Sequence, residues 1–115
     1  MRKNFSYDKL GDSLIVSNRQ EGDIIENNHE IGDMIFSMTR EGKIASLEIR
    51  EISSLFESCD VNPEIVNQIK DAKISIIDRS DTVILILQIQ FSENNLILTK
   101  NIPIVLPLFD QIHDL

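Results

Sequence analysis

Two aspartates and a tyrosine near the N-terminus are the residues best placed for chemistry. Tyr7 and Asp8 are followed by Asp12, directly ahead of an apolar run, in the stretch YDKLGDSLIV. Such carboxylates can hold a divalent cation or act as an acid/base pair, although Ca²⁺ and Mg²⁺ require more oxygen ligands than two. Aspartate also hydrogen-bonds nearby backbone groups and tolerates turn conformations, especially beside Gly11. We therefore expect mainly a turn, with Tyr7, Asp8 and Asp12 as the candidate ligand-binding residues.

The other residues that can do chemistry do not form a constellation. His29 lies in a polar stretch, His113 lies in the terminal tail, and Cys59 adjoins an aspartate with no histidine nearby in sequence. Metal sites and thiol nucleophiles need partners at defined spacing, and the known catalytic and nucleotide-binding motifs are absent from the chain. The sequence predicts no cofactor and no metal site, and it gives no positive support for an enzyme.

The composition predicts one strand-rich domain spanning residues 1–115. Hydrophobic residues make up 42% of the chain, and isoleucine, which packs well on pleated surfaces, dominates them. The net charge of −8, without a basic patch, argues against nucleic-acid binding. No signal peptide is evident, so we expect a cytoplasmic location. The longest apolar runs are far shorter than the roughly 18 residues of a membrane span, so we expect no membrane insertion.

The first half of the chain predicts hairpins followed by helices. Residues 4–8 and 13–17 form one hairpin, and residues 33–50 form a second one that turns at Gly42, where a left-handed backbone is needed. A short helix should end near Ser58. A second helix, over residues 60–71, begins with the N-cap Asn62 and packs on the sheet through Ile65, Val66 and Ile69.

The second half returns to strands and ends in an apolar segment. The stretch TVILILQIQF is apolar on both faces in its first half and alternates with glutamines in its second. Such a strand belongs in the middle of a sheet, covered on both faces at one end. The following stretch NIPIVLPLFD contains two prolines, which exclude a central strand and leave an edge strand or an extended arm. The arm either covers its own sheet or contacts another subunit, with Ile102, Pro103, Val105, Pro107 and Phe109 as the candidate interface.

Residues 5–56 resemble a small family of uncharacterised bacterial and archaeal proteins. The resemblance rests on Tyr7-Asp8, Asp12, Leu14 to Val16, Gly42, Ile44 and the segment Ser46 to Ile49. The family has no known function, so the resemblance implies a compact strand-rich fold and no reaction. This chain departs from the family pattern at Ser13, Ile15 and Ser46. Ser37 and Thr39 stand where the family often carries carboxylates, which weakens a cation site near that turn.

Together these patterns predict an α+β fold, mainly antiparallel sheet with two short helices. The leading hypothesis is a non-enzymatic interaction module that forms a homodimer through sheet edges or the C-terminal arm. The alternative is a protein that binds a small ligand or a divalent cation through Tyr7, Asp8 and Asp12. A third hypothesis is a hydrolase-like enzyme that uses the same carboxylates.

Overall fold

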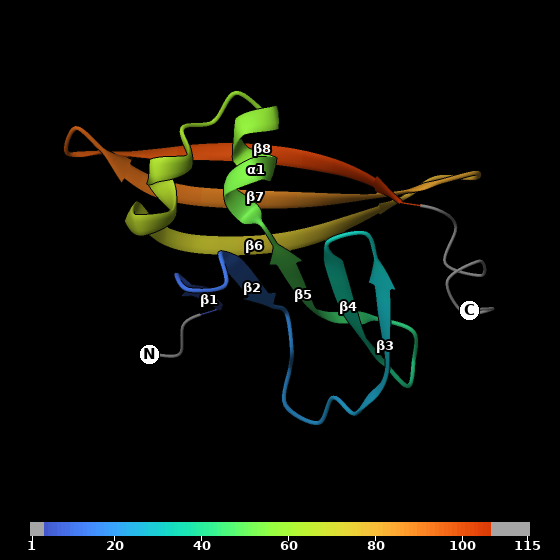
Figure 1. Cartoon of the computed structure of the whole chain (residues 1–115). Helices are drawn as coiled ribbons and strands as arrows, with labels where there is room; N and C mark the ends of the chain where they lie inside the picture. Colours follow the sequence, from blue (N-terminus) through green and yellow to red (C-terminus); the bar gives the residue numbers. More distant parts are fainter. Residues whose placement is uncertain (1–3, 107–115) are drawn as a thin grey trace.

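The computed structural model describes residues 4–106, with the side chain of Asp78 left out, and is an α+β structure dominated by antiparallel sheet (Figure 1). Within this range, a five-stranded sheet has the order β1-β2-β5-β4-β3 and a three-stranded sheet has the order β6-β7-β8. The strands of the first sheet are β1 (Phe5–Asp8), β2 (Ser13–Ser17), β3 (Ile25–Ile31), β4 (Met34–Thr39) and β5 (Ile44–Arg50). The second half of the chain forms α1 (Ile52–Ser58), the 3-10 helix η1 (Pro63–Gln68), β6 (Ile69–Asp78), β7 (Val83–Glu93) and β8 (Leu96–Leu106).

Both hairpins predicted in the first half are confirmed. Strands β1 and β2 pair antiparallel, and so do β4 and β5. In the β4–β5 turn, Gly42 has a φ of +86° and its N–H donates to the Thr39 carbonyl at 3.0 Å. The register shifts beside this turn, as expected for a short loop with a bulge. Glycine is needed here because a Cβ at this φ is strained.

The first predicted helix is confirmed as α1, and the second is confirmed as η1, although η1 is shorter than the predicted range of residues 60–71. Asn62 does act as the N-cap, since its side chain accepts a hydrogen bond from the Glu64 N–H at 3.0 Å. The helix is a 3-10 turn that ends at Gln68, and Ile69 already pairs with Phe91 in the sheet. The long ladder between β6 and β7 satisfies more backbone groups than a continued 3-10 helix, whose hydrogen bonds are poorer.

The core lies between the two sheets and is closed by α1 and η1. Alternate residues of β7, from Val83 to Phe91, are buried in one cluster with Phe36 and Leu47 of the five-stranded sheet and Phe56 of α1. In Figure 1 the five-stranded sheet runs across the three-stranded one. We call the face of the β6-β7-β8 sheet that points into this core its inner face, and the opposite one its outer face.

Strand β7 is the centre of its sheet, as predicted, and within residues 4–106 β8 is an edge strand, which is one of the two alternatives that the prolines left open. Pro103 lies opposite Ile86 in the ladder, where an edge position lets its missing N–H point away from β7. Ile102 is only 1% exposed and belongs to the core of its own chain, whereas Val105 is 69% exposed. Two of the candidate interface residues, Pro107 and Phe109, lie outside the described residues. No helix in residues 4–106 is long and apolar enough to cross a membrane.

Candidate functional site

Tyr7 and Asp12, two of the predicted site residues, are in direct contact. Tyr7 lies near the end of β1, and the turn that follows returns the chain so that the Tyr7 Oη donates to Asp12 Oδ1 at 2.8 Å. Asp12 has a φ of +51°, a left-handed conformation that aspartate tolerates better than most residues do. The expectation that this aspartate forms a turn is therefore confirmed.

Asp12 also holds the N-terminus of α1, which is distant in sequence. The Ser53 Oγ donates to Asp12 Oδ1 at 2.8 Å, and the Ser53 N–H donates to Asp12 Oδ2 at 3.3 Å. The Ile52 N–H donates to the Asp12 carbonyl at 3.0 Å. Glu51, the residue in the N-cap position, gives no side-chain cap. Asp12 thus satisfies free N–H groups that the helix cannot satisfy itself. We call Tyr7, Asp12 and Ser53 the Tyr7–Asp12 cluster.

Asp8 has a separate, local role. Its Oδ1 accepts a hydrogen bond from the Leu10 N–H at 3.1 Å, which closes the turn after β1. Burial raises the pKa of the Tyr7 hydroxyl, and the hydrogen bond and negative charge of Asp12 raise it further, with a smaller contribution from Asp8. A tyrosine with a raised pKa stays protonated at neutral pH and acts as a hydrogen-bond donor.

The surface beside the Tyr7–Asp12 cluster is a shallow hollow of about 340 Å³, lined by Tyr7, Lys9, Asp12, Ser53, Pro63, Glu64, Val66 and Asn67. Asp12 already accepts three hydrogen bonds through its carboxylate. Of the other charged residues in the lining, Lys9 is positive and Glu64 is negative, so they add no net negative charge that would attract a cation. In the part of the chain that the structure describes, no cluster of three or more His, Cys, Asp or Glu residues could hold a metal ion. The geometry supports a structural role for these carboxylates.

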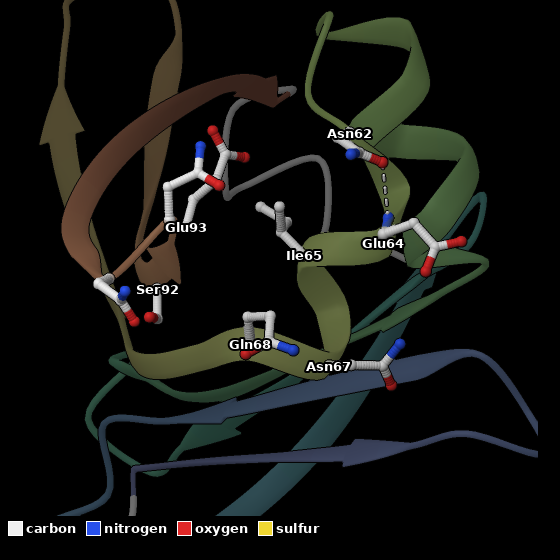
Figure 2. Close-up of a pocket in the computed structure, with 9 residues that line it drawn as sticks. Asn62, Glu64, Ile65, Asn67, Gln68, Ser92 and Glu93 are labelled. Atoms are coloured by element: carbon white, nitrogen blue, oxygen red, sulfur yellow. Dashed lines mark hydrogen bonds between the residues drawn. The ribbon is translucent and has the colours of Figure 1, made fainter.

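A second hollow, of about 420 Å³, opens between η1 and the β7–β8 turn (Figure 2). Ile65 at its base is buried, and polar side chains from η1 and from Ser92 and Glu93 surround it. Asn94 and Asn95 form the turn with positive φ angles of +51° and +66°. No signal in the sequence marks this hollow, because the turn and cap residues that line it are common on any protein surface. Its lining contains Ser92, Glu64 and Glu93 but no histidine, cysteine, lysine or arginine, so Ser92 has no histidine or lysine in this lining to activate it as a nucleophile.

The remaining candidates from the sequence are dispersed. His29 lies on β3 opposite Phe36, and Cys59 is a half-buried free thiol at the C-terminal end of α1. Their elements lie in different parts of the fold, and His113 is outside the described residues. The structure does not bring His29 and Cys59 together as a catalytic group.

The outer face of the β6-β7-β8 sheet is divided into two unlike halves. At one end it presents an apolar set that we call the outer patch, made of Ile77, Ile84, Ile86, Pro103 and Val105. Ile77 is 38% exposed, and Ile84 and Ile86 are half-buried. The other half is mostly polar, with Lys73 Nζ 3.8 Å from Asp71 Oδ2 and the Gln88 Nε2 donating to Asn101 Oδ1 at 3.1 Å, and it also carries the exposed Ile97 opposite Ser92. Within residues 4–106, the outer patch is thus an accessible apolar surface on a chain of net charge −8.

Comparisons of the chain with models of protein families, with curated proteins and with solved structures found no match. The resemblance of residues 5–56 to an uncharacterised family therefore stays a prediction. Two features of the structure bear on the function: the Tyr7–Asp12 cluster and the outer patch.

Proposed function

We propose that this protein is a non-enzymatic self-association module that works as a homodimer. The observation that carries the proposal is the outer patch, which the described residues leave accessible at one end of the three-stranded sheet. Antiparallel sheets with one wet face place polar residues on that face. Strand β7 follows this rule at Gln88 and Gln90 and breaks it at Ile84 and Ile86. Contiguous apolar surface of this kind is typical of protein–protein contacts.

The Tyr7–Asp12 cluster supports the non-enzymatic part of the proposal. A general base or a metal ligand needs an acceptor that is available to the substrate or ion. The Asp12 carboxylate instead accepts hydrogen bonds from the Tyr7 hydroxyl and from the hydroxyl and N–H of Ser53. The Asp8 carboxylate accepts one from the Leu10 N–H. These carboxylates are already engaged in holding a turn and a helix.

The test is the native mass of the full chain by light scattering over a concentration series, at low and at high salt. We expect a mass that rises from that of one 13.1-kDa chain toward twice that value as concentration increases. Salt should favour the dimer, because it screens the repulsion between chains of charge −8 and does not weaken apolar contacts. A single-chain mass at every concentration and salt level would refute self-association.

A further inference from the structure

We infer that the second copy of the chain stacks face to face on the outer patch, instead of pairing strand to strand along β8. The inference rests on the proposed self-association and specifies its contact. Two surfaces on this side of the molecule compete for that contact. One is the open edge of β8, and the other is the outer face of the sheet.

The edge of β8 has apolar side chains but also the features that prevent strand pairing. Leu96, Ile97 and Leu98 are 62%, 59% and 38% exposed. However, Pro103 lacks the N–H that a neighbouring strand would need, and Lys100 places a charge within the exposed half of the strand. Proline and lysine are the residues with which natural proteins protect sheet edges from pairing. The composition of β8 therefore disfavours a continuous sheet across two copies.

The outer face of the β6-β7-β8 sheet, in contrast, carries few charged side chains. Among the side chains that the paired registers of the three strands direct outward, the charged ones are Asp71 and Lys73, whose charged atoms lie 3.8 Å apart, and the exposed Lys70 lies in the bulge beside Asp71. The chain as a whole has a charge of −8. Two copies can therefore approach through this face without bringing unpaired carboxylates together, whereas most other approaches meet the acidic surface. A strongly basic partner finds no net negative charge here to attract it.

The shape of the outer patch suits an isologous contact. Ile84 and Ile86 on the central strand are flanked by Ile77 on β6 and by Pro103 and Val105 on β8, so the patch spans the full width of the sheet. In a twofold dimer the same patch contacts itself. Sheets that stack face to face lie about 10 Å apart with interleaved side chains. This places the apolar end of one copy on the apolar end of the other.

The experiment compares three aspartate variants on β8 and a fourth on β6, each in the full chain, by native mass over a concentration series. Val105→Asp and Thr99→Asp lie on the same strand and the same face, but only Val105 belongs to the outer patch. Leu98→Asp lies on the exposed half of β8 with its side chain on the inner side. All three positions are exposed, so circular dichroism should show wild-type folding. Ile77→Asp repeats the test from strand β6.

We expect Val105→Asp and Ile77→Asp to raise the dimer dissociation constant by about a hundredfold or more, because each copy would bury an unpaired charge. Thr99→Asp and Leu98→Asp should stay near the wild-type value. If Leu98→Asp dissociates the dimer and the patch variants do not, stacking on the outer patch is wrong while self-association stands. If the wild-type chain never dimerises, the proposed function itself fails and the stacking fails with it.

Discussion

Replacing Asp12 by alanine should destabilise the fold far more than its position in a surface turn suggests. Its carboxylate accepts hydrogen bonds from Tyr7 and from the side chain and backbone of Ser53. These bonds fix the turn between β1 and β2 and the N-terminus of α1 at the same time. Alanine removes all three bonds and leaves the N-terminus of the helix without its cap.

The magnitude follows from three contributions. Loss of a helix-capping side chain costs about 0.5–2 kcal/mol. A hydrogen bond to a charged group contributes about 1.5–3 kcal/mol, less where the freed donors can reach water, as they can in this half-exposed cluster. The φ of +51° adds about 1 kcal/mol, because alanine adopts the left-handed region less easily than aspartate does. We expect Asp12→Ala to lower the free energy of unfolding by about 2–4 kcal/mol.

Urea denaturation followed by circular dichroism measures this free energy. The matched control is Asp8→Ala, which removes one exposed hydrogen bond and should cost less than about 1 kcal/mol. A double-mutant cycle of Asp12→Ala with Tyr7→Phe should give a coupling energy above about 0.5 kcal/mol, because the two residues are hydrogen-bonded. A loss for Asp12→Ala no greater than for Asp8→Ala, or independent effects in the cycle, would show that the cluster does not hold the helix.

Three further outcomes can be checked on the same protein. Tyr7 is the chain's one tyrosine, so its absorbance should titrate above the ordinary pKa of 10.0, and the pKa should fall only partly in Asp12→Ala, since burial is the larger cause. The stability that is linked to this shift is complete below pH 10.0 and is lost as the pH rises through the raised pKa. A titration of Tyr7 at the ordinary pKa would contradict this. Gly42→Ala should cost about 1 kcal/mol in urea denaturation, because its φ is +86°; an unchanged midpoint would be inconsistent with that strain. Mg²⁺ or Ca²⁺ should leave the thermal midpoint unchanged, and a rise that Asp12→Ala abolishes would restore the cation-binding alternative.

The elements that sequence predicted correctly are those with a strong local pattern. The turn at Gly42, the cap at Asn62 and the edge position of Pro103 each follow from the backbone preference of one residue. The end of the second helix was predicted wrongly, because Ile69 fits a helical stripe as well as a strand. Only its partner Phe91 on β7, distant in sequence, decides between the two. The residues near Ile69 in sequence do not determine this pairing, because strand formation depends on cross-strand partners.

The candidate site also has one part that the sequence predicts and one part that it does not. The turn-forming roles of Asp8 and Asp12 could be predicted, because an aspartate side chain bonds the backbone two residues on, as in Asp8, and because aspartate tolerates a left-handed backbone, as in Asp12. The link from Asp12 to Ser53 could not, since it depends on β2 pairing with β5 and thereby bringing the start of α1 to the turn. A motif search by spacing therefore selects the correct residues and misses their structural partner.

The pattern of β7 connects the fold to the proposed function. Its first half is apolar on both faces, which requires cover on both faces, and that requirement was visible in the sequence alone. The structure supplies one cover: the inner residues, such as Leu85 and Leu87, are fully buried under the five-stranded sheet and the helices. The outer residues Ile84 and Ile86 are half-buried, with exposed Val105 beside them. The apolar composition of this face is therefore not explained by the packing of residues 4–106 alone, and the proposed contact with a second copy would supply the missing cover.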